Sequence, residues 1–301
     1  MRRILIISMI SAAFLLFSLR FGYGLGVDDS VEFFDIGQGD SSLVSCGRAQ
    51  MLIDGGPDRI VLNRLGHAMP FFDRRIEYLL LSHPHEDHVF GLFAVLDRYD
   101  VGRVLISEYA AEEWRGRDFI RFAESKGIEV LTVSAGDSIE LCPGMRMDIV
   151  WPDRMSSELV KQGRDEVNDL SVVGRLVALS PDGGENRQSA SRTKQAVCLS
   201  SPSGDKANIS SVLFTGDITA TAEQAILDSG ADISACVLKV PHHGSRYSST
   251  PEFLLAVSPE LSVIQVGENR HGQPSFSTIL RLEASGSVVH RTDIDRALKM
   301  Y

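Results

Sequence analysis

Cysteine is scarce in this chain of 301 residues, which contains only Cys46, Cys142, Cys198 and Cys236. They lie far apart and form no Cys-x-x-Cys pair. The sequence therefore excludes a cysteine-held zinc module and a disulfide-dense scaffold. No histidine lies beside any of them in the sequence, so we interpret them as core residues rather than nucleophiles. The spacing is compatible with one or two disulfides.

An excess of positive charge is absent as well. The chain has 30 basic and 40 acidic residues, a formal net charge of −10. This disfavours a protein that coats nucleic acid, because such a protein needs a basic surface to neutralise phosphates. Hydrophobic residues make up 44% and charged residues 23%, as in an ordinary globular protein rather than a disordered or fibrous one. The length suits one large α/β domain or two small ones.

Only one long hydrophobic run occurs, Ile4–Leu19, and it follows Arg2 and Arg3. This arrangement predicts that residues 1–26 are a signal peptide or an N-terminal membrane anchor. Because the two arginines precede the run, the positive-inside rule places residues 27–301 outside the cytoplasm. We expect this part to be secreted, periplasmic or held at the membrane by an uncleaved segment. No protein partner is inferred from the sequence.

The remaining chain is patterned as strands and helices. Short apolar runs separated by glycine turns predict strands first, and strands then alternate with amphipathic helices such as Ala110–Lys126 and Ala220–Ser229. This order predicts two mixed sheets face to face, with helices outside. Residues 181–210 are rich in Ser, Gly, Asp and Arg, and we expect an exposed hairpin or a mobile insertion there.

The strongest chemical signal is His83-Pro84-His85-Glu86-Asp87-His88, which follows the apolar run Tyr78–Leu81. Three imidazoles and a carboxylate within six residues suit zinc or manganese. A His-x-His pair at the end of a strand can direct both rings at one ion. The turn that follows presents Asp87 and His88 to a second position nearby. The motif therefore predicts a metal site.

Three further motifs also follow apolar runs: Leu52-Ile53-Asp54-Gly55-Gly56, Thr215-Gly216-Asp217 and Pro241-His242-His243-Gly244-Ser245. Asp217 is placed to bridge two cations. Adjacent histidines point in different directions, so at most one of the pair is expected to reach the same metal. We favour His242, which is nearest the strand end, and His243 is the alternative. Asp54 is interpreted either as a turn residue or as a partner that orients a ligand.

Together these motifs resemble those of the metallo-β-lactamase superfamily. Phe34-Asp35-Ile36-Gly37-Gln38-Gly39-Asp40, Asn168-Asp169-Leu170-Ser171 and Arg291-Thr292-Asp293 further resemble the carboxy-terminal domain of ComEC, a DNA-internalisation competence protein. The resemblance spans about residues 31–293. It implies an α/β fold, a four-layer αββα sandwich, here preceded by one N-terminal hydrophobic helix. ComEC also has a multi-helix membrane channel, and its channel function does not carry over to a chain with a single hydrophobic segment.

The resemblance also implies roles for individual residues. His83 and His85 would hold one metal ion, zinc or manganese, and Asp87, His88 and a histidine of Pro241–Ser245 would hold the other, with Asp217 bridging them. Asp87 would also orient or deprotonate the attacking water. Residues implied to fix the imidazole rings are Asp35, Asp40 and Asp54. Candidates for substrate contact are Ser245 and Asn269.

Two departures from the family pattern bear on these roles. No histidine lies between His88 and His242, where the superfamily usually supplies a third histidine to the first metal. An oxygen of Asn168 or Asp169 is the expected replacement, which would favour manganese. The second departure is Asn269-Arg270-His271-Gly272-Gln273-Pro274, in which the family's Tyr and His are His271 and Gln273. His271 is either a compensating group or a solvated loop residue.

Three functions are weighed for this chain. The first is hydrolysis of a phosphodiester, with DNA as the substrate that the resemblance implies, by a metal-activated hydroxide. The second is hydrolysis of a cell-envelope phosphate ester, or of another small ester or lactam, outside the cytoplasm. The third is a binding protein that keeps the fold without catalysis. The intact histidine motifs favour an enzyme. The acidic net charge weighs against tight duplex binding but not against metal-assisted cleavage.

Overall fold

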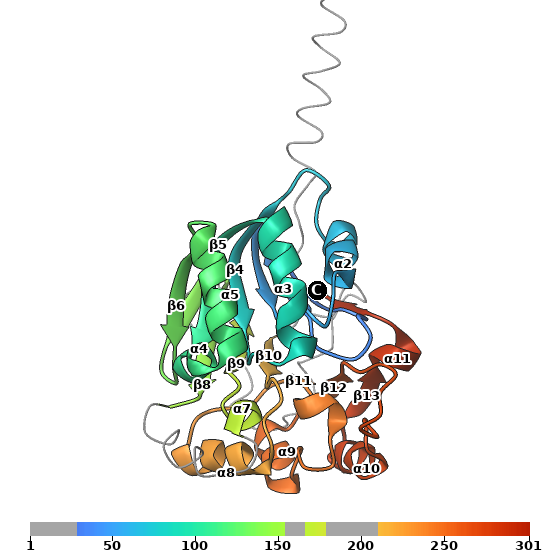
Figure 1. Cartoon of the computed structure of the whole chain (residues 1–301). Helices are drawn as coiled ribbons and strands as arrows, with labels where there is room; N and C mark the ends of the chain where they lie inside the picture. The colour runs from blue at the N-terminus through green and yellow to red at the C-terminus, as the bar shows by residue number, and fades with distance from the viewer. Residues whose placement is uncertain (1–28, 154–165, 179–209) are drawn as a thin grey trace, which may run out of the picture.

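Two mixed sheets of seven strands each lie face to face in the computed structural model (Figure 1). The structure describes residues 29–153, 166–178 and 210–301. The first sheet has the order β14 (Leu298–Met300), β1 (Ser30–Phe33), β2 (Ser42–Cys46), β3 (Ala49–Ile53), β4 (Arg75–Leu81), β5 (Asp100–Ser107), β6 (Glu129–Val133). The second has the order β13 (Val288–Arg291), β12 (Leu261–Ile264), β11 (Val237–Lys239), β10 (Ser211–Phe214), β9 (Val173–Ala178), β8 (Met145–Trp151), β7 (Ser138–Cys142).

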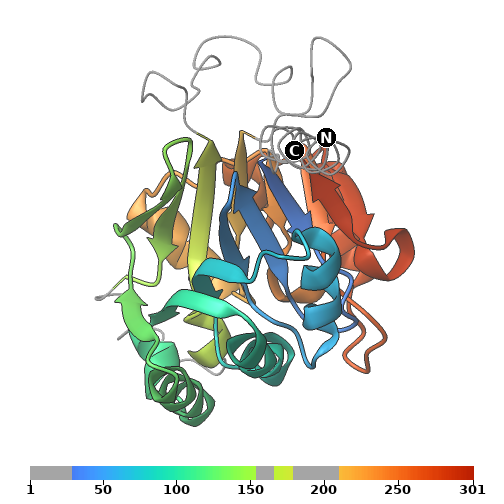
Figure 2. The same cartoon turned by 90° about the horizontal axis from the view of Figure 1, so that it is seen from above.

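Helices cover the outer face of each sheet, so the predicted four-layer arrangement is confirmed (Figure 2). Over the first sheet lie α2 (Ile60–Ala68), α3 (Glu86–Arg98), α4 (Glu108–Glu112) and α5 (Trp114–Ser125). Over the second lie α8 (Ala220–Ser229), α9 (Pro251–Val257) and α10 (Phe276–Ala284). The short elements are α7 (Glu166–Asp169), the 3-10 turn η1 (Pro241–Gly244) and α11 (Thr292–Asp295).

Three apolar clusters account for the layering. One fills the space between the sheets, where the rings of Phe33 and Phe214 lie 5.8 Å apart. A second joins the first sheet to its helices, and a third does the same for the second sheet. Each sheet is thus buried on both faces, which explains why its central strands are apolar runs rather than alternating patterns.

The predicted helix Ala110–Lys126 is two helices, which corrects that expectation. Glu113 has extended backbone angles (φ −74°, ψ 147°), and its side chain accepts a hydrogen bond from the Arg115 N–H at the start of α5. A residue in this conformation ends α4 and caps α5, so the chain turns where the periodicity alone predicted continuity. By contrast, Ala220–Ser229 forms α8 with the predicted bounds.

A disulfide between Cys46 and Cys142 joins β2 of the first sheet to β7 of the second. Cys236 is also disulfide-bonded. The interpretation that these three cysteines are not nucleophiles is therefore consistent with the structure, because a disulfide sulfur carries no thiolate.

Two predicted segments cannot be compared with the structure. The expected leader, residues 1–26, lies outside the described residues, and so does nearly all of the expected insertion at 181–210. Within the three described ranges, no helix has the length and apolar character needed to span a membrane.

The parallel parts of the two sheets bring four strand ends together. In the first sheet β3 and β4 are parallel, and in the second β10 and β11 are parallel. The four histidine and carboxylate motifs follow the carboxyl ends of these strands. Ligand sites of α/β sheets lie in this position, because connecting loops there can present side chains without interrupting the sheet.

Candidate metal centre

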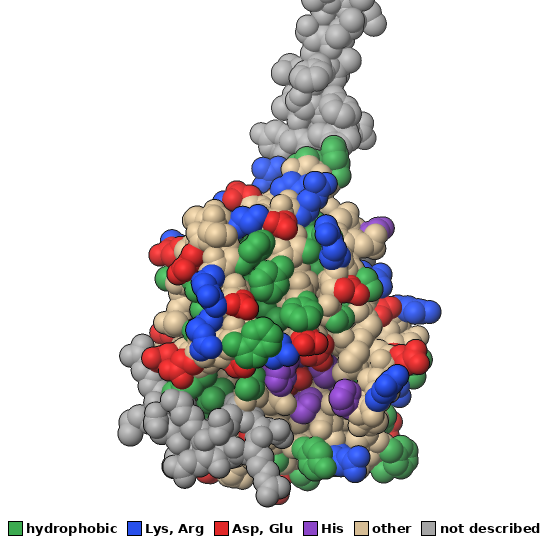
Figure 3. All heavy atoms as spheres, viewed as in Figure 1, with side chains coloured by type: hydrophobic (Ala, Val, Ile, Leu, Met, Phe, Trp, Pro, Cys, Tyr) green, Lys and Arg blue, Asp and Glu red, His purple; other side chains and the backbone are tan. Residues whose placement is uncertain are grey.

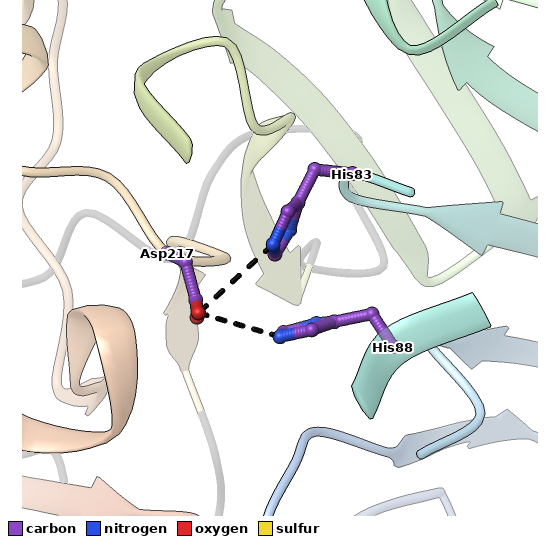
Figure 4. Close-up of side chains that lie close together, drawn as sticks. All are labelled: His83, His88 and Asp217. Atoms are coloured by element: carbon purple, nitrogen blue, oxygen red, sulfur yellow. Dashed lines mark ion pairs between the residues drawn. The ribbon is translucent and has the colours of Figure 1, made fainter. Parts of the chain in front are cut away.

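Asp217 is the centre of the cluster that these loops form. Its Oδ2 lies 3.2 Å from His243 Nε2, 3.4 Å from His88 Nε2 and 3.9 Å from His83 Nε2. Figure 4 shows His83 and His88 directed at Asp217 from the opposite side of the site. The carboxylate comes from the second sheet, and two of the imidazoles come from the first. Asp217, expected to bridge two ions, is therefore surrounded by imidazole nitrogens from both sheets.

Of the two adjacent histidines after β11, His243 and not His242 is the one whose ring lies in the cluster. His243 is buried, and its Nε2 lies 3.3 Å from Asp87 Oδ2 as well as near Asp217. His242, which the sequence favoured, belongs to none of the groups of side chains close enough to share an ion. Both residues have left-handed backbone angles, with φ of 51° and 52°. The tight turn η1 thus directs the second ring, not the first, into the cluster.

Hydrogen bonds fix which nitrogen of each ring faces the cluster. His243 Nδ1 lies 2.9 Å from the backbone carbonyl of Gln265, which can only accept a hydrogen bond. His88 Nδ1 lies 2.9 Å from Asp54 Oδ2. Each Nδ1 therefore carries a proton and donates it outward, and each Nε2 is directed at the cluster. This is the usual support of histidine ligands in metal sites.

Asp54 has the orienting role that the sequence gave as one of two alternatives. It is buried, with φ of 57°, and also accepts hydrogen bonds from the Ser82 N–H at 2.8 Å and the Ser82 hydroxyl at 2.7 Å. These contacts tie the end of β3 to the end of β4. Asp54 thereby holds His88 and the residue before His83 in one arrangement.

Asp40 reaches the cluster through a close approach of two backbones. Its Oδ1 lies 3.3 Å from His243 Nδ1, and its N–H donates to the backbone oxygen of Asp87 at 3.2 Å. The preceding Gly39 has φ of 133°, and a Cβ there would lie 2.3 Å from the same Asp87 oxygen. Only glycine fits this position, so the Gly37-Gln38-Gly39-Asp40 run places a second carboxylate behind His243.

Lys239 is a member of the cluster that the sequence reasoning missed. Its side chain is 2% exposed, and its ammonium group contacts Asp40 Oδ2 and lies 3.6 Å from Asp217 Oδ1. It also donates to the Gly216 carbonyl at 2.9 Å. A lysine inside an apolar strand next to Pro-His-His was the available signal, because a buried ammonium needs carboxylate partners.

The electrostatics of the cluster favour positive charge at its centre. Burial would raise the pKa of Asp217, but His243 and His88 hold that pKa well below its usual range. Burial would lower the pKa values of His88 and His243, yet neighbouring carboxylates, Asp217 foremost, raise both well above the ordinary value. For His83, burial and then the positive charge of His88 lower the pKa well below its usual range.

The donor set fits divalent metal ions. His88 Nε2 and His243 Nε2 are buried and have no hydrogen-bond partner among the described residues, although both are directed at carboxylates. Four three-residue groups of the described residues have ligand atoms within 4.8 Å of one another. Two of them combine imidazoles with the predicted metal-binding carboxylates: His83, His88 and Asp217, and Asp87, His88 and His243. The other two contain Asp40, with Asp217 and His243 or with Asp54 and His88. Imidazole with carboxylate is the ligand mixture of zinc and manganese sites.

The first of the two expected positions is less complete than the second. His85, predicted as a ligand, is half-buried and contacts His83, with 3.1 Å between His85 Nδ1 and His83 Nε2, but like His242 it belongs to none of the groups close enough to share an ion. Asn168 Oδ1 is buried and without a hydrogen-bond partner among the described residues. It lies on the segment that pairs with Ser82, where the Val172 N–H donates to the Ser82 carbonyl at 2.9 Å. Asn168 thus keeps a side-chain oxygen free on a segment that is tied to the residue before His83.

Asp169, the alternative to Asn168, has a structural task. Its Oδ1 accepts hydrogen bonds from the Thr219 N–H at 2.8 Å and the Thr219 hydroxyl at 2.6 Å. It therefore holds the loop that follows Asp217. Of Asn168 and Asp169, Asn168 is the residue whose buried side-chain oxygen has no hydrogen-bond partner among the described residues.

The remaining predicted residues lie in supporting loops or farther away. Asp35 pairs with Arg64 at 3.6 Å and Arg296 at 3.7 Å, outside the cluster. Asn269 organises its own loop through the carbonyls of Gly267 and Gln273. Ser245 Oγ accepts from the Tyr247 N–H at 3.3 Å. His271 is exposed.

The substitution of glutamine for the family histidine has a visible consequence. Gln273 Nε2 donates to the carbonyl of His242 at 3.1 Å, and Gln273 Oε1 accepts from Gln38 at 3.1 Å. The glutamine thus joins the η1 turn to the loop before Asp40. It supports the backbone of the cluster, and nothing suggests that His271 takes over its position.

The cluster opens to the surface. Figure 3 shows histidines gathered at one place on this face, bordered by acidic side chains. Asp87, whose side chain is 31% exposed, and half-buried His85 form the outer part, while His83, His88 and His243 lie deeper. A substrate group can therefore approach the cluster without a large rearrangement.

Comparisons with known proteins agree with this geometry. The model of the Metallo-beta-lactamase superfamily matches residues 35–177. ComE operon protein 3 of Bacillus subtilis (strain 168) is 25% identical over 288 residues, which cover 89% of this chain and 32% of that protein. Competence protein ComA of Neisseria gonorrhoeae is 37% identical over 90 residues, 29% of this chain and 13% of that protein. The chain thus spans about a third or less of the length of these relatives.

A solved structure shows the same fold. The metallo-beta-lactamase fold protein YhfI from Bacillus subtilis has a TM-score of 0.54 at 10% identity, covering 90% of this chain and 100% of that one. The predicted resemblance and fold are therefore confirmed. The matched span 35–177 includes Asp40 and His83–His88, so this part of the chain is similar to the metallo-β-lactamase superfamily, and the chain as described has its fold.

Proposed function

We propose that this domain is a metal-dependent phosphodiesterase that acts on DNA. The observation that carries the proposal is the convergence of His88 Nε2 and His243 Nε2 on the Asp217 carboxylate in a fold of hydrolase type. The choice of DNA is supported by the competence proteins that the chain resembles over most of its length or in part.

Divalent ions at this cluster would lower the pKa of a water molecule and stabilise negative charge on phosphate oxygens. His83, His88, His243 and Asp217 would hold them, and His85, which contacts His83, and Asn168 are the candidates for a further ligand at the first position. Zinc or manganese suits these donors, and the amide oxygen of Asn168 favours manganese.

Asp87 is the residue we assign to proton handling. It is the most exposed carboxylate of the cluster, and its Oδ2 lies 3.3 Å from His243 Nε2. Burial would raise its pKa, but the hydrogen bond from His243 and the charge of His88 hold the pKa well below the usual range. Asp87 therefore stays ionised at neutral pH, where it can orient a water or accept its proton.

We also propose that the domain works outside the cytoplasm. The disulfide between Cys46 and Cys142 supports this location, because such bonds form and persist in oxidising compartments. The arginine-led hydrophobic run at residues 4–19 supports it independently.

The test is a substrate panel with the Mn²⁺-loaded protein. Labelled single-stranded and double-stranded DNA are incubated beside phosphocholine and a β-lactam. We expect degradation of DNA. Hydrolysis of phosphocholine or the β-lactam with DNA left intact would contradict the proposed substrate and favour a small envelope ester or lactam. No hydrolysis of any of them by metal-loaded protein would contradict the enzymatic function.

A further inference from the structure

A pocket of about 460 Å³ lies next to the metal centre and has no role in the function proposed above. Its walls include Thr219, Thr221, Arg246, Tyr247 and Arg281. The wall residues come from the loop after Asp217, the loop after His243 and helix α10. These are two of the loops that build the cluster itself.

The pocket and the cluster are close because they share these loops. Thr219 lies two residues after Asp217, so their Cα atoms are at most about 7.6 Å apart. Arg246 lies three residues after His243. The Ala220 N–H donates to the Tyr247 carbonyl at 2.9 Å, which joins the two loops directly. A chain-like substrate held at the cluster would therefore have this pocket within reach.

The pocket is basic. Among the described residues, neither Arg246 nor Arg281 forms an ion pair with a carboxylate. Arg281 donates to the carbonyls of Ser248 and Ser249, both at 2.8 Å, and so fixes the loop that carries Arg246. No acid is among the residues that line the pocket, and Glu223, which accepts hydrogen bonds from the wall residue Thr250, is fully buried. Arg246 remains as an exposed cation available to a phosphate.

Tyr247 adds a flat aromatic surface beside that cation. Its side chain is 66% exposed, and the Arg246 guanidinium lies 5.7 Å from the centre of its ring. An exposed large aromatic side chain is costly to keep in water. Paired with a basic residue, it is the usual platform on which an unpaired base stacks while its phosphate is neutralised.

We propose that this pocket is a binding subsite for single-stranded nucleic acid, in which Arg246 neutralises a phosphate and Tyr247 stacks with a base. The inference rests on the proposed phosphodiesterase function for its substrate class. It adds that the strand is single, because bases stacked in a duplex do not offer a free face to Tyr247. The acidic net charge of −10 agrees, because it weighs against tight binding of duplex DNA.

The test measures binding apart from catalysis. Fluorescence anisotropy with a labelled oligothymidylate is recorded on the full chain stripped of metal by chelation, with folding of each variant checked by circular dichroism. We expect Tyr247→Ala to weaken binding by about fivefold or more, and Tyr247→Phe, which keeps the ring, by less than about twofold. Arg246→Ala should reduce the slope of log K against log salt by about 0.7, the value for one phosphate contact on a single strand.

Arg98→Ala is the matched control, because Arg98 is exposed at the opposite end of α3 from the cluster. It should leave both the affinity and the salt slope as in the wild type. The proposal is overturned if Tyr247→Ala and Arg246→Ala bind like this control, or if duplex DNA binds as tightly as the single strand. Binding without any hydrolysis after Mn²⁺ is restored would instead contradict the phosphodiesterase function and leave the subsite supported.

Discussion

At the scale of single residues, the sequence predicted that the four motifs would lie together. It did not identify every side chain that faces the shared site. Asp217, His83 and His88 converge, although the expected partner of His83 at one ion was His85 rather than His88. The fourth motif offered adjacent histidines, and the choice depended on the left-handed turn at positions 242 and 243, which residue types do not reveal. Lys239 was given no role from the sequence, because its partners Asp40 and Asp217 are distant from it in the sequence.

The two histidines give the first prediction. His243→Ala should lower the affinity for Zn²⁺ or Mn²⁺ by at least about 100-fold, because it removes a ring nitrogen directed at Asp217. His242→Ala should lower it by less than about threefold, since His242 is outside the groups that can share an ion. Isothermal titration calorimetry on the two variants measures this. The opposite order would return the ligand role to His242.

Asp87 gives the second prediction. Asp87→Ala should reduce the turnover of bis(p-nitrophenyl) phosphate by at least about 100-fold, the usual scale for a group that handles the proton. Glu86→Ala is the control. Glu86 is the adjacent carboxylate, but it is exposed and pairs with Arg115 at 2.8 Å rather than with the cluster. Equal turnover in Asp87→Ala and wild type would place proton transfer elsewhere.

At the scale of helices and strands, prediction succeeded where the apolar pattern of a strand is strong and failed where it is weak. β8, in which buried and half-buried residues alternate, has the bounds Met145–Trp151 that this alternation indicates. β7, with the sequence Ser-Ile-Glu-Leu-Cys, and the three-residue β14 at the chain's end are sheet edges with little apolar character, and neither was predicted. Edge strands are formed by their neighbours, so their own residues give a weak signal.

The disulfide between the inner strand β2 and the edge strand β7 gives the third prediction. Replacing both Cys46 and Cys142 with alanine should lower the free energy of unfolding by about 3–5 kcal/mol, because the bond closes a long loop and joins the two sheets. Its sequence separation is 96 residues. Urea unfolding of the double variant, compared with the oxidised and reduced wild type, measures the effect. If the double variant unfolds at the same urea concentration as the oxidised wild type, the cross-link does not stabilise the fold.

At the scale of the whole molecule, the metal centre lies between the two halves of the sandwich. His83 and His88 follow a strand of the first sheet, and Asp217 and His243 follow strands of the second. An ion held by all four would cross-link the halves. The family resemblance implied a metal site built from both halves of the chain. Composition and periodicity alone predicted only two sheets with helices outside.

Metal removal gives the fourth prediction. With free metal at about 100 times its dissociation constant, binding should stabilise the folded state by about 2.7 kcal/mol, so chelation should lower the melting temperature by about 5–10 °C. Asp217→Asn should abolish this dependence on metal, and His271→Ala should keep it because His271 is exposed and away from the cluster. A melting temperature unaffected by chelation in the wild type would show that no ion joins the halves.

The most direct measurement of the central claim is phosphodiester turnover as metal is added back to the stripped protein. Bis(p-nitrophenyl) phosphate hydrolysis should be absent without metal, rise with added Mn²⁺ or Zn²⁺, and saturate at about one to two equivalents per chain, as expected for one or two ions in a superfamily site. Turnover that persists in the fully stripped protein, or that stays absent when elemental analysis shows the metal bound, would contradict the assignment of the cluster as a hydrolytic metal centre.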